Sequence, residues 1–598
     1  MIKPILTFAC LLFLLAACNK TQKPCEPRER DTALLAIDSL AASLDWPDSL
    51  QITGFAGPAL TPSPACLAVA PTGEVYVGVD MIGSLGKDPG KGSIVRLTDC
   101  NNDGVLDSHT EFARVDNPRG IIALGNRLFV LHTVFSEDGF ARGMDLVVFE
   151  DKDNDGVADG PSRPLIRHIS SPKFLQSRGT DHATNGIRMG IDGWIYIAVG
   201  DFGFHGATDR EGTKLTMLGG GIVRVRPDGT EMEIYSHGMR NIYDMAIDPY
   251  MNIFTRGNTN DGGGWNIRFS HQVQSGEYGY PVLFKHFTEE IIPAMADLGG
   301  GSGTGALFMD DPSWPDRYNR VPIMADWGRS QLYIHRLSPS GASFRQEEEE
   351  FLKLPQITDL DMDASGRLYL SAWDGAGYSG DSSKGFVVRA VPRNWQYKPF
   401  PDLRKASVAE LQALLGSASG VVRLHAQQEL IGRPAGEAAA AAWKLAGNKG
   451  LPLYARVAGI FTYAQAAGKE GIENLVQLAS EEAVREFALR ALADRKPFVK
   501  EVPIEPFISG LKDPSPRVQA AAIIGLGRLG RREAAGALLK VPVPASFVSP
   551  AKGEEGPHAT PNPEIIPAHL AVQSLVRLHA VDACVAAIGS EHSDIALW

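Results

Sequence analysis

The stretch GIDGWIYIAVGD, residues 190–201, places a Gly-containing turn before a short strand of apolar and aromatic residues. A turn followed by such a strand is typical of an antiparallel hairpin. The pattern recurs between about residues 50 and 395. Its other copies are APTGEVYVGVD (70–80), ALGNRLFVLHT (123–133), AIDPYMNIFTRGN (246–258), DMDASGRLYLSAWD (361–374) and a looser one in VPIMADWGRSQLYIHRL (321–337).

These copies predict a β-propeller for residues 50–395. They follow one another at steps of roughly 40–75 residues, and each is an all-β unit without a long amphipathic helix. One such unit forms a blade, which buries its two faces against neighbouring blades. Six copies therefore predict six blades, in a chain whose 598 residues exceed what a single hydrophobic core can organise.

The composition changes after the linker PRNWQYKPFPDLRK, so that residues 396–598 are rich in Ala, Leu, Glu and Arg at helical spacing. A second repeat is present there, and DPSPRVQAAAIIGLGRLGRREAAGALL (513–539) resembles a HEAT repeat. Its copies are VVRLHAQQEL (421–430), YARVAGIFTY (454–463), AVREFALRAL (483–492), RVQAAAIIGL (517–526) and AHLAVQSLVR (568–577). We expect a HEAT-like α-solenoid that continues beyond Trp598, with an irregular helical domain as the alternative. The fold class is thus mainly β plus α.

The N-terminus has the features of a lipoprotein signal. A lysine and a short apolar run precede Leu-Ala-Ala-Cys, which resembles a bacterial lipobox ending at Cys18. We expect residues 1–17 to be removed, Cys18 to carry the lipid, and residues 18–49 to tether the propeller. Because Asn19 follows, the expected location is the cell envelope, on the outer membrane, facing the periplasm or the exterior. A plain signal peptide is the alternative.

Charge and cysteine content exclude several classes of protein. The formal net charge is -12 and the sequence has no basic stretch, which argues against nucleic acid as a partner. No C-x-x-C pair is present, so a zinc ribbon and a covalently bound c-type haem are both excluded. A disulfide between Cys66 and Cys100 fits an oxidising periplasm, but spacing alone leaves that pairing open.

Two aspartate-rich loops predict structural calcium sites. DCNNDGVLD (99–107) and DKDNDGVAD (151–159) place oxygen side chains at positions 1, 3, 5 and 9 and glycine at position 6. A solvated Asx-rich hairpin is the alternative for each loop. The expected ligands are Asp99, Asn101, Asp103, the Val105 carbonyl and Asp107 in the first loop, and Asp151, Asp153, Asp155, the Val157 carbonyl and Asp159 in the second.

Three segments carry a resemblance to a known family. DHATNGIRMGIDGWIYIAVGD (181–201), SHGMRNIYDMAIDP (236–249) and GEYGYP (276–281) are similar to motifs of the glucose/sorbosone dehydrogenases. That family consists of six-bladed propellers and includes the soluble pyrroloquinoline-quinone glucose dehydrogenases. The resemblance covers roughly residues 50–395.

The resemblance implies an oxidoreductase that acts on CH–OH groups and passes hydride to pyrroloquinoline quinone. His182 would be the base that takes the proton from a sugar or related alcohol or aldehyde. Asp201 would orient His182, Arg240 would stabilise the reduced quinone, and Asn241 would help to hold the cofactor.

The layout of propeller and HEAT repeats resembles large membrane-bound dehydrogenases of bacteria, many of which append a cytochrome c. This implies a cytochrome c as electron acceptor, and the solenoid could dock a protein partner. Two alternatives of other classes stay open: a non-catalytic carbohydrate- or protein-binding propeller, and a calcium-dependent lactone hydrolase with carboxylates that converge on the central channel.

Overall fold

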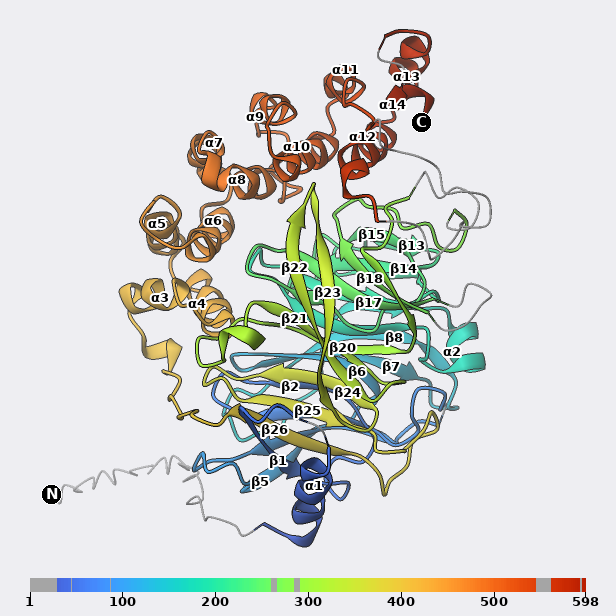
Figure 1. Cartoon of the computed structure of the whole chain (residues 1–598), viewed down its shortest axis with the longest axis vertical. Helices are drawn as coiled ribbons and strands as arrows, with labels where there is room; N and C mark the ends of the chain where they lie inside the picture. The colour runs from blue at the N-terminus through green and yellow to red at the C-terminus, as the bar shows by residue number, and fades with distance from the viewer. Residues whose placement is uncertain are drawn as a thin grey trace, which may run out of the picture.

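Six antiparallel sheets form the first part of the protein, as predicted. The computed structural model describes residues 30–44, 46–86, 88–259, 266–283, 291–544, 561–591 and 594–598. Figure 1 shows the sheets packed together as one β-rich body, with the helices of the C-terminal part in an arc along it. The architecture is therefore a six-bladed β-propeller followed by a helical region.

Each blade is one sheet, and the blades are numbered here in chain order. In blade 1 the strands from the channel outward are β2 (Pro64–Val69), β3 (Val75–Asp80), β4 (Gly92–Thr98) and β5 (Ser108–Ala113). Blade 2 contains β6 (Asp116–Leu124), β7 (Arg127–Phe135), β8 (Ala141–Glu150) and β9 (Arg163–Ile169), and blade 3 contains β10 (Thr184–Met189), β11 (Ile195–Val199), β14 (Gly220–Val225) and β15 (Glu233–Met239).

The remaining three blades follow the same order. Blade 4 contains β16 (Ala246–Ile247), β17 (Ile253–Thr259), β18 (Asn266–Gln272) and β19 (Ala296–Gly300), and blade 5 contains β20 (Gly303–Met309), β21 (Val321–Asp326), β22 (Gln331–Ser340) and β23 (Ser343–Lys353). Blade 6 contains β24 (Ile357–Met362), β25 (Leu368–Ala372), β26 (Phe386–Pro392) and β1 (Leu50–Ala56).

Both ends of the propeller sequence meet in blade 6. The outermost strand, β1, pairs antiparallel with β26, from Leu50 opposite Pro392 to Ala56 opposite Val387. This pairing closes the ring, because it ties the start of the propeller to its last sheet.

Blade 2 has two additional strands beyond its outermost strand, β9. A hairpin of β12 (Phe204–Asp209) and β13 (Lys214–Met217) leaves blade 3 and pairs with β9.

Five of the six sequence copies correspond to the second strand of a blade, namely β3, β7, β11, β17 and β25, whereas the looser copy at 321–337 covers the second strand β21 and, after its turn, the third strand β22. The faces of the second strands pack against the neighbouring blades, so both faces are covered. Every residue of β3, β11, β21 and β25 is buried. Burial on both faces explains why the copies are runs of apolar and aromatic residues instead of alternating patterns.

The C-terminal region is a row of helices. These are α3 (Val408–Leu415), α4 (Gly420–Ile431), α5 (Ala435–Ala446), α6 (Leu453–Ala467), α7 (Ile472–Ala479), α8 (Arg485–Leu492), α9 (Glu505–Gly510), α10 (Pro516–Leu529), α11 (Ala535–Leu538), α12 (Ile566–Arg577), α13 (Val581–Ala587) and α14 (Asp594–Leu597). The five helical sequence copies fall on α4, α6, α8, α10 and α12. In Figure 1 the even-numbered helices lie nearer the propeller than their odd-numbered neighbours α3, α5, α7 and α9.

The even-numbered helices pack against the turns that join the first and second strands of the blades, and we call this side of the propeller the solenoid face. Gln465 of α6 donates to the carbonyl of Ile191 at 3.2 Å, and Arg490 of α8 donates to the carbonyls of Tyr250 and Met251 at 2.9 Å each. Trp194, which is fully buried, donates from its indole to Asp494 at 2.8 Å. Propeller and solenoid therefore share one interface of buried side chains.

Two short helices lie outside the solenoid. The segment predicted as a tether contains α1 (Thr32–Ala42), capped by Asp31 and packed on β1, where Ile37 contacts Gly54. In blade 2, α2 (Pro172–Arg178) precedes β10. Residues 1–17 and Cys18, for which the signal and the lipid were predicted, lie outside the described residues. Among the described helices, none is both long and apolar enough to cross a membrane.

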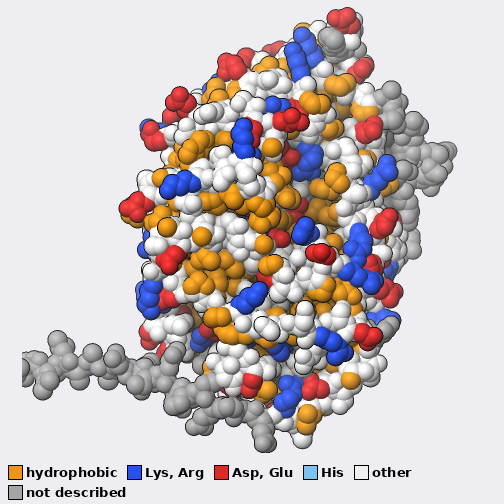
Figure 2. Space-filling view, turned by 60° about the vertical axis from the view of Figure 1, so that its left-hand side comes forward, with side chains coloured by type: hydrophobic (Ala, Val, Ile, Leu, Met, Phe, Trp, Pro, Cys, Tyr) orange, Lys and Arg blue, Asp and Glu red, His pale blue; other side chains and the backbone are white. Residues whose placement is uncertain are grey.

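The surface carries charges of both signs. The face in Figure 2 shows Lys and Arg side chains interspersed with Asp and Glu, and apolar side chains between them. Since the signs are mixed over the described part of this face, its electrostatic field does not favour a ligand of one charge.

Candidate active site

A cavity of about 540 Å³ opens on the side of the propeller opposite the solenoid, which we call the pocket face. Residues from all six blades line it, and they lie in the channel strands or the loops that precede these, and at the ends of the second strands or just after them. A volume of this size suits a small-molecule ligand. The lining residues are Ala65, Ser84, Leu85, Arg119, Arg178, Asp181, His182, Asn241, Tyr243, Asn258, Gly300, Gly301, Ser302, Gly303, Thr304, Trp327, Gly328, Arg329, Thr358, Trp373 and Tyr378.

His182 and Asp201 meet in the wall of this cavity. His182 precedes β10 and Asp201 follows β11, and the antiparallel pairing of these strands brings the two ends together. The carboxylate oxygen Oδ1 of Asp201 is hydrogen-bonded to Nδ1 of His182. Gly200 permits this close turn, because a Cβ there would lie 2.5 Å from the carbonyl oxygen of His182. The predicted base and its predicted partner are thus in direct contact.

The second ring nitrogen of His182, Nε2, lies on the side of the cavity. The His182 side chain is 5% exposed, and Phe202 covers it with its ring centroid 5.7 Å away. Nε2 lies 3.6 Å from Oδ2 of Asp181, which also lines the cavity. When Nδ1 donates its proton to Asp201, Nε2 carries the lone pair and can accept a proton from a ligand.

Arg240 and Asn241 occupy different depths of the same wall. Asn241 lines the cavity and donates to the carbonyl of Asp181 at 3.2 Å. Arg240 does not line the cavity, and its Nη1 donates to Oδ1 of Asn258, which does, at 2.6 Å. Arg240 therefore acts on the cavity through Asn258.

The sequence analysis did not single out several other lining residues. Arg119 comes from blade 2, where it contacts Asp80 at 2.5 Å, and Tyr243 comes from the start of blade 4. Burial, opposed by Arg119 and reinforced by Asp181, raises the pKa of Tyr243 to about 12. Trp327 and Trp373 each follow directly on the second strand of a blade, β21 and β25. The sequence signal that could have identified these residues is the tryptophan that directly follows the strand in two of the repeated copies.

Five buried polar atoms in the cavity wall have no hydrogen-bond partner among the described residues. They are the Ser84 hydroxyl oxygen, Arg119 Nε, Asn241 Oδ1, Trp327 Nε1 and Trp373 Nε1. Buried polar atoms normally find a partner, so their convergence on one cavity indicates that a polar ligand completes the site. Three of the five are obligate donors, which suits a ligand rich in acceptor oxygens.

Below the cavity, a charged cluster crosses the channel. Arg188 of β10 contacts Asp244 at 2.6 Å, Asp359 at 3.2 Å and Asp361 at 3.6 Å. These carboxylates also accept backbone N–H groups of neighbouring channel strands, from Ala306 to Asp244 and from Leu67 to Asp359, at 3.0 and 2.8 Å. Burial raises the pKa of Asp359 to about 7 despite the opposing charge of Arg188. The cluster ties the blades together.

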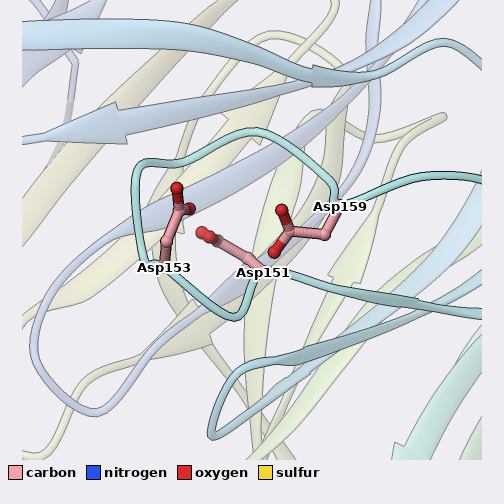
Figure 3. A group of neighbouring side chains, drawn as sticks. All are labelled: Asp151, Asp153 and Asp159. Atoms are coloured by element: carbon pink, nitrogen blue, oxygen red, sulfur yellow. The ribbon is translucent and has the colours of Figure 1, made fainter. Parts of the chain in front are cut away.

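The two predicted calcium loops differ in their surroundings. In the second loop, oxygens of Asp151, Asp153 and Asp159 lie within 4.8 Å of one another. Figure 3 shows the three carboxylates gathered within the turn of this loop. Gly156 has φ +87°, which allows the sharp turn. The acceptors and the turn therefore fit a calcium ion, although Asp155 uses one oxygen to accept from the backbone of Val157 at 3.0 Å.

In the first loop a guanidinium stands beside the predicted ligands. Arg367 Nη1 lies 3.6 Å from Oδ2 of Asp99, which accepts from the backbone of Gly104 at 2.8 Å, as Asp151 accepts from Gly156 at 3.0 Å in the second loop. Asn101, Asp103 and Asp107 likewise accept backbone N–H groups within the loop. Within the described part of the chain, this loop forms no group of three acidic oxygens at metal spacing. The fixed charge of Arg367 fits a cation poorly.

Cys66 and Cys100 do not form the disulfide that the sequence analysis left open. Cys66 is a buried free thiol, and Cys100 is disulfide-bonded, so the two are not joined to each other. Burial in β2 of blade 1 raises the pKa of the Cys66 thiol well above its usual range.

Models of two known protein families match parts of this chain. A family model described as "Domain of unknown function (DUF7133)" matches residues 38–354, more than half of the chain, and a HEAT-repeat model matches residues 472–541. The HEAT match confirms the predicted type of helical repeat. No curated protein matches the chain.

Several solved structures resemble the propeller. A proposed oxidoreductase (glucose dehydrogenase) from Thermus thermophilus is 19% identical, with a TM-score of 0.43, and the match covers 57% of this chain and 100% of that one. The PQQ-bound aldose sugar dehydrogenase of Streptomyces coelicolor is 18% identical, with a TM-score of 0.42 and coverage of 58% and 99%. The PQQ domain of a pyranose dehydrogenase from Coprinopsis cinerea is 12% identical, with a TM-score of 0.38 and coverage of 58% and 97%.

Proposed function

We propose that this chain, which belongs to the DUF7133 family, is a quinone-dependent dehydrogenase that oxidises a sugar or a related alcohol or aldehyde. The observation that carries the proposal is the His182–Asp201 pair in the wall of a cavity whose buried donors lack partners among the described residues. Such a pair is suited to taking a proton from a hydroxyl group, and the donors are suited to holding an acceptor-rich cofactor.

His182 acts as the base in this proposal. Its Nδ1–H is directed to Asp201, so Nε2 accepts the proton of the substrate hydroxyl. The carboxylate of Asp201 then stabilises the imidazolium that forms, as in other carboxylate–histidine pairs. Asp181, with Oδ2 at 3.6 Å from Nε2, adds a second negative charge on the other side of the ring.

The cavity residues fit pyrroloquinoline quinone, a flat tricarboxylate. Arg119, Trp327 and Trp373 each offer a buried N–H without a partner among the described residues, and Asn241 lies beside His182 in the same cavity. Arg178 and Arg329 add positive charge at the wall. When bound, the quinone supplies the acceptor for the hydride that leaves the substrate carbon. Arg119, Asn241, Trp327 and Trp373 are the residues that would hold it.

The test combines binding with turnover. We expect the full chain to bind pyrroloquinoline quinone saturably and then to reduce a dye in the presence of one member of a panel of sugars and alcohols. His182→Gln should retain quinone binding and lose dye reduction, since the base is absent. His109→Gln, in an exposed part of β5, is the matched control and should behave as the wild type.

Other outcomes would overturn the proposal. Absence of quinone binding by the wild type would favour the non-catalytic binding propeller, whereas substrate-dependent reduction that survives in His182→Gln would remove His182 from the reaction. The lactone hydrolase alternative requires channel carboxylates that are free to hold calcium. Asp244, Asp359 and Asp361 do converge on the channel, but they converge on Arg188, which neutralises part of their charge.

A further inference from the structure

We propose that Tyr280 is the positioning residue for the His182–Asp201 pair. Asp201 has two carboxylate oxygens, and each has its own partner. Oδ1 is hydrogen-bonded to Nδ1 of His182, and Oδ2 accepts from the hydroxyl of Tyr280 at 3.2 Å. With both oxygens engaged, the carboxylate cannot rotate without breaking one of the two bonds. This inference rests on the proposed function, because it assigns Tyr280 a role in the acid–base step.

The direction of the hydrogen bond follows from the chemistry of the two groups. An ionised Asp201 has only acceptors, so the Tyr280 hydroxyl donates to Asp201, and the positive charge of Arg240 lies close to the same hydroxyl. Burial and the neighbouring Asp201 raise the pKa of Tyr280, which keeps its proton available for donation. Tyr280 thus links the positive charge of Arg240 to the carboxylate that orients His182.

The backbone around Tyr280 is fixed on both sides. Its N–H donates to the carbonyl of Gly238 at 2.8 Å, and Glu277 in the same loop accepts from the N–H of Gly279 at 2.7 Å. Gly238 has φ +92°, and a Cβ there would lie 2.4 Å from the nitrogen of Gly279. The loop therefore approaches β15 more closely than any side chain at residue 238 would allow.

The solenoid contributes to this placement. Nδ1 of His237 lies 2.5 Å from Oε2 of Glu277, and the N–H of Glu277 donates to Nε2 of His569 in α12 at 3.1 Å. The loop that presents Tyr280 is consequently held between blade 3 and the helical region. Tyr280 is half-buried and does not line the cavity, so its effect on a ligand passes through Asp201.

The consequence is a fixed tautomer of His182. Oδ1 of Asp201 is kept at Nδ1, which retains the proton, and Nε2 keeps its lone pair toward the cavity. Without the Tyr280 hydroxyl, Asp201 can turn away from Nδ1, and His182 then also populates the neutral tautomer with its proton on Nε2, which lies 3.6 Å from Oδ2 of Asp181. The tautomer with the proton on Nε2 cannot act as a base toward a ligand in the cavity.

The experiment uses Tyr280→Phe in the full chain with ¹⁵N-labelled histidine. We expect the wild-type resonances of His182, assigned by their loss in His182→Gln, to show one neutral tautomer with the proton on Nδ1. Tyr280→Phe should show exchange between both tautomers. Tyr397→Phe, which removes an exposed phenol from the linker, is the matched control and should leave the His182 resonances unchanged. A thermal melt of each variant confirms that the fold is retained.

Turnover provides the second measurement. Loss of a hydrogen bond to a charged group should lower kcat of quinone-linked dye reduction about ten- to a hundredfold and leave KM nearly unchanged. Unchanged His182 resonances in Tyr280→Phe would refute the positioning role, whatever the activity. A wild-type protein without quinone-linked turnover but with the single Nδ1–H tautomer would instead refute the proposed function and leave the positioning of His182 intact. Unfolding of Tyr280→Phe would shift the test to Arg240→Gln, which removes the positive charge beside the same hydroxyl.

Discussion

Replacing Glu233 by Gln should destabilise the protein by about 3 kcal/mol, because Glu233 is the anion at the centre of the interface between propeller and solenoid. It lies in β15, and its side chain is 9% exposed. Arg224 of the same blade contacts it at 2.6 Å, and Arg528 of α10 contacts it at 2.8 Å. These two arginine side chains are 2% and 3% exposed, so water does not compensate them when the carboxylate is lost.

The size of the destabilisation depends on the hydrogen-bond and ion-pair partners that Arg224 and Arg528 retain in Glu233→Gln. Breaking a buried ion pair by removal of one partner costs about 3–5 kcal/mol. Arg224 retains Asp494 at 3.4 Å, and Arg528 retains two backbone carbonyls, of Ala493 at 2.6 Å and Asp494 at 2.8 Å. Since both keep partners, we expect the lower end of that range.

The pH dependence gives the prediction a second part. Burial disfavours the ionised form of Glu233, but Arg528, Arg224 and Lys496 together outweigh it and hold the pKa of this carboxyl well below its usual range. A lowered folded-state pKa stabilises the fold above the unfolded value of about 4.3, and this stability is lost as the pH falls below it. The gap between wild type and Glu233→Gln should therefore be constant above about pH 5 and narrow in more acidic solution.

The assay is urea unfolding followed by tryptophan fluorescence and far-UV circular dichroism. Glu349→Gln is the matched control, because Glu349 also contacts two arginines, Arg317 and Arg336, whose side chains are 67% and 37% exposed. Exposed pairs contribute about 1 kcal/mol or less, so this variant should unfold nearly as the wild type does. Equal loss in both variants, or a gap for Glu233→Gln that does not narrow in acid, would refute the reasoning.

Three further predictions concern the site, the channel and the calcium loops. Asp201→Asn should lower dye-linked turnover by about 10²–10⁴-fold without weakening quinone binding, because the amide can no longer hold His182 with its proton on Nδ1; an unchanged rate would exclude Asp201 from the reaction. The pKa of Asp359, about 7, lies above the usual value, so the folded state loses stability as the pH rises from about 4 to about 7. In urea unfolding, the stability of the wild type relative to Asp359→Asn should therefore fall with rising pH. A difference that stays constant with pH would contradict this prediction. Calorimetric titration with calcium should give one site that is lost in Asp153→Asn and kept in Asp103→Asn, and loss in the second variant alone would reverse the assignment of the loops.

Local patterns were sufficient to predict the elements of the fold. Five of the six copies of the turn-and-strand phrase mark the second strand of a blade, because that strand is buried on both faces and burial fixes its composition; the looser copy at 321–337 spans β21 and β22 of blade 5. The helical copies mark α4, α6, α8, α10 and α12, whose small and apolar residues pack against the neighbouring helices and the propeller. His182 and Asp201 were also within reach of the sequence, since they flank two strands that pair directly.

Contacts between distant blades could not be predicted from such local sequence patterns. Arg119, Trp327 and Trp373 belong to blades 2, 5 and 6, and they share a cavity with His182 of blade 3 only because the ring closes. Arg367, which stands beside the first predicted calcium loop, comes from blade 6 and meets blade 1 through the same closure.

The sequence by itself thus determined the blades and the helical repeat, because each depends on periodicity, whereas the roles of His182 and Asp201 were expectations from the family resemblance. The tertiary structure alone decided which loops surround the cavity, that the second aspartate-rich loop fits calcium better than the first, and that Tyr280 reaches Asp201. The physical reason is that these contacts depend on the closure of the ring and on the packing of the blades and solenoid, which bring together side chains that no local pattern relates.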